Sequence, residues 1–283
     1  FGENSDTFKL VPASGCQTNS EYINTLIGKN NFKFPYAYYS DESMTPTSTQ
    51  NELIIYLEDD SVKYTLNSIP FQSHSKLPKI QNDDKNVVLY IDATIPVSKI
   101  IPILNKLYLD DYSLDFASSD SNYPLSEAVT ITPRYIRNFI QLADETYVLD
   151  YCEFCNKYQD VKIDSILTFE MIKSDLYLYH TDTINTFGVR NKITKFLGQN
   201  RTTRLSTEIQ ILIMDTTSFG DYLEMFDMFP FINTDLSSIT YYRGKDDPDQ
   251  EKILEIQETN YNQLQEEFPL RIREIIQTTP NTK

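Results

Sequence analysis

The stretch Asn86-Val-Val-Leu-Tyr-Ile-Asp92-Ala-Thr94 predicts a short strand that runs into a turn. The residues that follow, Val97 to Leu109, carry apolar side chains at the spacing of a helix. Tyr112 to Ala117 then predicts a second strand. The expected order is therefore strand, turn, helix and strand.

The same order occurs a second time, closer to the end of the chain. Glu208-Ile-Gln-Ile-Leu-Ile-Met-Asp215-Thr-Thr217 is again a strand that ends in Asp-x-Thr, and Phe219 to Phe231 again has a helical pattern. Ser218, with Asp221 three residues later, resembles a capping box that opens this helix. Leu236 to Tyr242 is expected to be the closing strand. A repeat with the period of a small domain predicts a duplication rather than a solenoid.

Hairpin patterns precede both copies. Leu53 to Leu66 and Ile166 to His180 each contain an apolar run, a polar turn and an alternating run. The second copy has an additional helical stretch, Val189 to Leu197, in a connection where insertions are tolerated. The predicted fold class is α+β: two tandem small domains, each a mixed sheet with two helices on one face (β-β-α-β-α-β), plus a C-terminal helix.

The stretches outside the copies set the expected domain boundaries. Pro133 to Ala143 has helical spacing with a proline in the first turn, so we expect a helical connector between the copies. A charged break near Lys245 to Gln250 precedes a polar final helix. The expected ranges are an N-terminal extension or linker over 1–50, a first repeat over 51–120, the connector over 121–163, a second repeat over 164–245, and a C-terminal helix and tail over 246–283.

The composition excludes several classes of function. The chain has 283 residues and a formal net charge of −16, and nucleic-acid-binding proteins rely on Lys and Arg to neutralise phosphates. With 7 Gly and no Gly-x-Gly-x-x-Gly or Walker sequence, no phosphate-binding loop is expected. No apolar run of about 18 residues occurs, so we expect no transmembrane segment within this chain.

Cys152-Glu-Phe-Cys155 is the one short motif with a recognised chemistry. The two thiols are a candidate disulfide, and a metal site or a redox-active pair are the alternatives. A structural zinc site needs four ligands in most cases, and the other His and Cys residues (Cys16, His74 and His180) are distant in sequence. A thioredoxin-type pair opens a helix, whereas this motif lies in a connecting segment. We therefore expect no cofactor and no metal.

Asp92 and Asp215 end the two repeated strands and are the acidic residues of greatest interest. A carboxylate just before a helix caps the helix or closes the turn, and this is the favoured interpretation. The alternative is a pair of acids for hydrolysis, which requires the two side chains to meet across a cleft. His180 alternates with two leucines, so we expect a partly buried side chain on a strand. No catalytic residue is expected.

The repeat unit resembles the periplasmic domain of the ExbD/TolR family. The resemblance rests on the strand Val87 to Thr94 with the helix Val97 to Leu109, and on Gln265 to Glu274, which is similar to a closing aromatic-Pro-x-Arg-Ile segment in some members. It covers the first copy, the second copy less closely, and the end of the chain. Known members carry a single such domain behind one transmembrane helix with a proton-handling Asp. This chain departs from that pattern in two ways: the helix is not within it, and two copies of the domain are expected.

The resemblance implies a non-enzymatic periplasmic module of an energy-transducing, biopolymer-transport complex. It implies localisation in the periplasm or export, with attachment to the inner membrane through a segment that is not present here. The implied partner is a TonB-like protein, a motor subunit or the cell wall. The expected route is strand addition to exposed sheet edges, and the candidate edge residues are Leu114, Phe116, Ser237, Ile239 and Tyr241.

Two other functions remain open from the sequence alone. One is a stand-alone exported protein that binds a ligand or glycan between the two copies, since domain interfaces are common places for pockets. The other is a redox enzyme built on Cys152 and Cys155. The sequence also leaves the oligomeric state open, including a homodimer.

Overall fold

The computed structural model divides into two compact units. Unit 1 holds Phe1–Pro133 and Thr216–Glu224, and unit 2 holds Arg134–Asp215 and Met225–Lys283. The residues that the structure describes are 32–35, 51–67, 69–72, 77, 86–110, 112–118, 129–131, 136–141, 147–151, 161–199, 201–226, 228–229, 231–233, 235–236 and 270–277.

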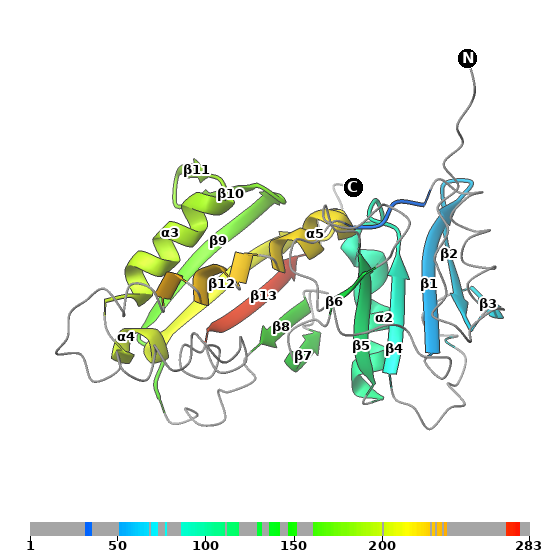
Figure 1. Ribbon diagram of the computed structural model, residues 1–283, viewed down its shortest axis with the longest axis horizontal. Coiled ribbons are helices and arrows are strands. Elements are labelled where there is room, and N and C mark those ends of the chain that lie inside the picture. Colours follow the sequence, from blue (N-terminus) through cyan, green and yellow to red (C-terminus); the bar gives the residue numbers. More distant parts are fainter. Residues whose placement is uncertain are drawn as a thin grey trace, which may run out of the picture. The chain divides into compact units, whose positions relative to one another are not determined.

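Unit 1 contains a six-stranded mixed sheet in the order β3-β2-β1-β4-β5-β6 (Figure 1). The central strands β1, β4 and β5 run parallel, and each outer neighbour pairs antiparallel. Helix α2 (Val97–Leu109) connects β4 to β5. The strand bounds are β1 Asn51–Glu58, β2 Ser61–Leu66, β3 Ile69–Phe71, β4 Asn86–Ile91, β5 Ser113–Ser118 and β6 Val129–Ile131.

The β1–β2 hairpin has a two-residue turn, which lies in the polar stretch where the sequence predicts a turn. Glu58 pairs with Ser61, and the turn residues Asp59 and Asp60 have φ values of 49° and 57°. Both therefore adopt the left-handed conformation that a type I′ hairpin turn requires, which Asp tolerates better than most residues. Local turn chemistry thus sets the register of this pair.

Helix α2 has the bounds that its apolar spacing predicts. Six of its apolar side chains are buried, and the stripe they form gives the helix an inward face. Pro102 lies inside the helix, where it removes one backbone hydrogen bond. Since α2 connects two parallel strands, it is the crossover that such a pair needs.

Unit 2 contains a seven-stranded mixed sheet in the order β11-β10-β9-β12-β13-β8-β7. Its central strands β9, β12 and β13 run parallel. The strand bounds are β7 Ile136–Gln141, β8 Tyr147–Tyr151, β9 Ser165–Lys173, β10 Leu176–Tyr179, β11 Asp182–Ile184, β12 Thr207–Met214 and β13 Arg271–Gln277. The helices are α3 Thr186–Leu197, α4 Arg201–Ser206 and α5 Phe219–Phe226, most of which falls in unit 1.

Two predicted elements are wrong. Pro133 to Ala143 was expected to be a helix, but Ile136–Gln141 is strand β7, because pairing with β8 overrides its helical spacing. Leu236 was expected to open the closing strand of the second repeat, but it is helical. The strand next to β12 is instead β13, whose buried and exposed residues alternate. The rest of the expected strand and the expected C-terminal helix lie outside the described residues.

The two sheets differ in how their faces are covered. In unit 1 both faces of the central strands are buried, and β1 and β4 carry the continuous apolar runs Leu53 to Leu57 and Val87 to Ile91, as expected for central parallel strands. In unit 2, β9 alternates between buried and exposed residues, and Ile166 and Ile172 are 55% and 52% exposed. The molecule therefore consists of two mixed sheets with a few helices, which is the α+β class.

Candidate partner-binding site

The turn after β4 is organised by Asp92. Its Oδ1 accepts hydrogen bonds from the Thr94 N–H at 2.9 Å and from the Thr94 hydroxyl at 2.7 Å. Its own N–H donates to the Ile55 carbonyl at 2.9 Å, and the residue is 3% exposed. These hydrogen bonds replace the ones that the Asp92 carboxylate would make with water, so its burial is compensated. Asp92 therefore closes the turn, which is the role that the sequence favoured.

A separate segment, Phe32–Pro35, lies against this turn. The Lys33 N–H donates to Asp92 Oδ2 at 3.3 Å, and the Lys33 carbonyl accepts from the Ala93 N–H at 2.8 Å. Both backbone groups of one residue are thus paired with the turn. This is how a folded domain holds an extended segment through its main chain.

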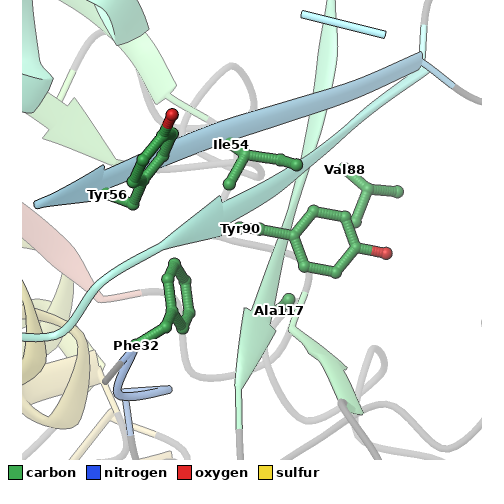
Figure 2. Packing of buried hydrophobic residues seen from close by; sticks show 6 residues of the cluster. All are labelled: Phe32, Ile54, Tyr56, Val88, Tyr90 and Ala117. Atoms are coloured by element: carbon green, nitrogen blue, oxygen red, sulfur yellow. The ribbon is translucent and has the colours of Figure 1, made fainter. Parts of the chain in front are cut away.

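The side chains of the same segment cover one face of the sheet. Phe32 is 6% exposed, and Phe34 packs against the same cluster, with the two ring centroids 5.1 Å apart. Residues two apart point to the same side of an extended chain. Figure 2 shows the Phe32 ring directed at the cluster, which consists of Ile54, Tyr56, Val88, Tyr90 and Ala117 in addition to Phe32. We name this face, together with the Asp92 turn, the aromatic face.

The aromatic face follows from the spacing of residues on two neighbouring strands. Ile54 and Tyr56 are two apart on β1, Val88 and Tyr90 are two apart on β4, and Ile54 lies opposite Tyr90 in the parallel register. The alternation of side chains therefore brings all four to one face. Sequence reasoning identified both strands but not the covering segment, because four residues with two phenylalanines carry no periodic signal.

The turn after β4 also contacts the turn that precedes α5. Pro96 and Ser218 form an isolated antiparallel bridge. The Val97 N–H donates to the Thr217 carbonyl at 2.9 Å, and the Phe219 N–H donates to the Ile95 carbonyl at 2.7 Å. The sequence predicted both strand–turn–helix junctions but not that they would pair.

The predicted edge residues Leu114 and Phe116 require a correction. They lie on β5, between β4 and β6, and are 7% and 3% exposed. Phe116 packs against Phe219 with ring centroids 5.4 Å apart. Their strand is interior because β6 pairs with its outer side. The other predicted edge residues, Ser237, Ile239 and Tyr241, lie outside the described residues.

The remaining candidate residues lie in unit 2 or outside the described residues. Asp215 belongs to unit 2, where its N–H donates to the Gln277 carbonyl at 2.9 Å. His180 is exposed in a turn with a φ of 55°, so the expectation of a partly buried strand residue is wrong. Cys152 and Cys155 lie outside the described residues, as does His74.

Polar side chains form a network on the open face of the unit 2 sheet. Glu208 Oε1 lies 3.3 Å from Arg273 Nη1 and accepts a hydrogen bond of 2.7 Å from Gln210 Nε2. The three residues come from β12 and β13, which are neighbours in the sheet. The side chain of Glu208 is 12% exposed and that of Arg273 is 37% exposed, so the pair lies at the boundary between the sheet and the solvent.

The described part of the chain contains neither a metal-binding cluster nor a helix that could span a membrane. No group of three or more His, Cys, Asp and Glu side chains is placed to hold a metal ion there. None of the helices described is both long and apolar enough to cross a membrane.

Comparison with known proteins gives no match. No family model fits this chain, and neither a curated protein nor a solved structure is detectably similar to it.

Proposed function

We propose that this chain is a non-enzymatic, periplasmic protein-interaction module of an energy-transducing complex like those of the ExbD/TolR family. Its partner is a TonB-like protein or a motor subunit, which presents an extended segment that takes the place of Phe32–Pro35 on the aromatic face. Attachment to the inner membrane belongs to the same proposal.

One observation carries the proposal: the aromatic face already holds an extended segment. Phe32 and Phe34 contact the sheet through alternate side chains, and Lys33 between them is paired at both backbone groups. Main-chain hydrogen bonds supply affinity in such a complex, and pockets for alternate side chains supply specificity. A partner segment of the form aromatic-x-aromatic has the same groups to offer.

The strand orders support a duplication, which we propose as the origin of the two units. The series β3-β2-β1-β4-β5-β6 and β11-β10-β9-β12-β13-β8 have the same succession of antiparallel and parallel pairs. In both sheets a hairpin lies on one side of the parallel strands and an antiparallel strand on the other, although β6 follows the parallel strands in the chain and β8 precedes them. We assign partner binding to unit 1 because its aromatic face already holds an extended segment.

The test is site-specific photocrosslinking in the native cells. We place p-benzoylphenylalanine at Tyr56, a residue of the aromatic face, in the full-length chain and identify the captured protein by mass spectrometry. We expect an envelope protein that co-purifies with a motor subunit. A second variant, Asp92→Asn, removes the charge that receives the Lys33 N–H and is expected to reduce the yield of this crosslink several-fold.

The matched control is Phe187, which is 62% exposed and lies in unit 2. The photoreactive residue at that position is expected to capture no such envelope protein. Capture of the same protein equally at both positions, or of cytosolic proteins only, contradicts the proposal. If Asp92→Asn leaves the yield of the crosslink unchanged, the Asp92 turn is not part of the binding site.

A further inference from the structure

The two strand–turn–helix junctions cap each other. The first N–H groups of a helix have no partner within the helix. Val97 is the first residue of α2 and Phe219 is the first residue of α5, and each donates to a carbonyl of the other junction. In each junction the donor N–H belongs to the residue after the bridging residue, Pro96 or Ser218. The acceptor carbonyl belongs to the residue before it, Ile95 or Thr217. This reciprocity is the hydrogen-bond pattern of an antiparallel bridge.

A third hydrogen bond breaks the symmetry of this contact. The Gly220 N–H donates to the Ala93 carbonyl at 2.8 Å. A Cβ atom at Gly220 would lie 3.0 Å from the Ala93 Cβ and 3.2 Å from the Ala93 carbonyl oxygen. Such distances are shorter than carbon–carbon contact at the optimum of the attraction. Glycine is therefore the residue that lets the second junction approach Ala93 so closely.

The corresponding residue of α2 is not a glycine. Gly220 is the second residue of α5, and Ser98 is the second residue of α2. If the α2 junction of a second copy took the place of Thr216–Glu224, its Ser98 would occupy the position of Gly220. The Ser98 Cβ would then be too close to Ala93. The segment Thr216–Glu224 has a further anchor in Phe219, which is 1% exposed.

We propose that Ala93–Val97 is a docking surface that selects a strand–turn–helix junction with glycine at the second helical position. Gly220 is then the specificity-determining residue that makes the chain's own Thr216–Glu224 the occupant. The equivalent junction of a second copy is excluded by Ser98. This inference is independent of the aromatic face and of its partner.

The first experiment measures hydrogen exchange at the amides of Val97 and Phe219 in the full-length chain. Gly220→Ala is expected to increase the exchange of both amides by about tenfold, since it opens the local contact. Adding Ala93→Gly to this variant removes the methyl group that the new Cβ at position 220 would meet. The double variant is therefore expected to regain the slow exchange of both amides. Gly188→Ala is the matched control, because a Cβ there would lie 3.0 Å from the Ile184 Cβ in unit 2.

The second experiment transfers the glycine between the junctions. The double variant Ser98→Gly with Gly220→Ser is expected to give a concentration-dependent doubling of the mass by light scattering, relative to the unmodified chain. The single variant Gly220→Ser is expected to keep the unmodified mass. The proposal is overturned if Gly220→Ala leaves both amides protected, if Ala93→Gly fails to restore them, or if the transferred glycine leaves the mass unchanged.

Discussion

Tyr64 lies half-buried on β2, where its ring stacks on Phe71 with centroids 5.4 Å apart. Burial disfavours the phenolate and raises the pKa of Tyr64 above the ordinary value of 10.0. The unfolded chain therefore loses this proton at a lower pH than the folded chain. The contribution of Tyr64 to stability is fully present below pH 10 and is lost as the pH rises through the folded-state pKa.

We predict that Tyr64→Phe makes the protein less sensitive to alkaline pH. The free energy of unfolding of the unmodified chain should fall more steeply above pH 10 than that of the variant, because Phe has no proton to lose. Urea titrations of both proteins at several pH values measure the difference. Parallel curves across this range would contradict the prediction. The other tyrosines cancel in the comparison because both proteins contain them.

At the scale of single residues, the sequence predicted Asp92 better than Phe32. An Asp at the end of a strand and before a helix has few structural roles, and closing the turn is one of them. Phe32 lies in a stretch without periodicity, so nothing local indicates what it covers. The prediction for His180 was wrong because strand β10 ends one residue earlier, at Tyr179, so that His180 lies in the turn.

Among the elements, α5 is capped by the Ser218 side chain, the residue that its sequence indicates. Ser218 Oγ accepts from the Asp221 N–H at 3.1 Å and donates to Asp221 Oδ2 at 2.6 Å. Helix α2 begins after Pro96, which makes no side-chain capping bond. The two helices that follow the repeated strands therefore start in chemically different ways.

We predict that Ser218→Ala lowers the free energy of unfolding by about 1 kcal/mol. The reason is that the Asp221 N–H loses its side-chain acceptor. Urea unfolding checks the value. Asn185→Ala removes the corresponding cap of α3, where the side chain accepts from the Gly188 N–H at 2.9 Å, and it should cost a similar amount. A Ser218→Ala variant as stable as the unmodified chain would show that water replaces the cap.

The spacing of apolar residues was sufficient to predict the elements near each hairpin. It was insufficient for the strands whose partners lie far away in the sequence. Strands β1, β2, β4, β9 and β12 and helix α2 were predicted from their own residues. Strand β7 was mistaken for a helix because its short apolar pattern fits both periods. Strand β13 was not assigned to the sheet, since its neighbour β12 lies far away in the sequence and only tertiary pairing places it there.

On the scale of the whole molecule, each unit has a core of its own. Leu89 on β4 and Ile211 on β12 are both fully buried, the first in unit 1 and the second in unit 2. Domains with separate cores unfold as separate cooperative units. The size of the chain, 283 residues, agrees with two such units.

We predict two transitions in calorimetry, each sensitive to one core. Leu89→Ala should lower the midpoint of one transition and Ile211→Ala that of the other, since each change costs about 3 kcal/mol through a cavity and lost burial. Differential scanning calorimetry of the three proteins measures this. A single transition that both variants shift equally would mean that the units unfold together.

The position of two short segments has a consequence for the order of folding during synthesis. Unit 1 is otherwise formed by residues up to Pro133 but includes Thr216–Glu224, and the unit 2 sheet has β13 between β12 and β8. Unit 1 therefore cannot be completed before Thr216–Glu224 has been translated, and the unit 2 sheet cannot be completed before β13 has been translated. Until Phe219 emerges, the apolar surface at Phe116 lacks this contact, and until Arg271–Gln277 emerges, β12 and β8 have no strand between them. Such nascent edges and apolar surfaces are what chaperones bind.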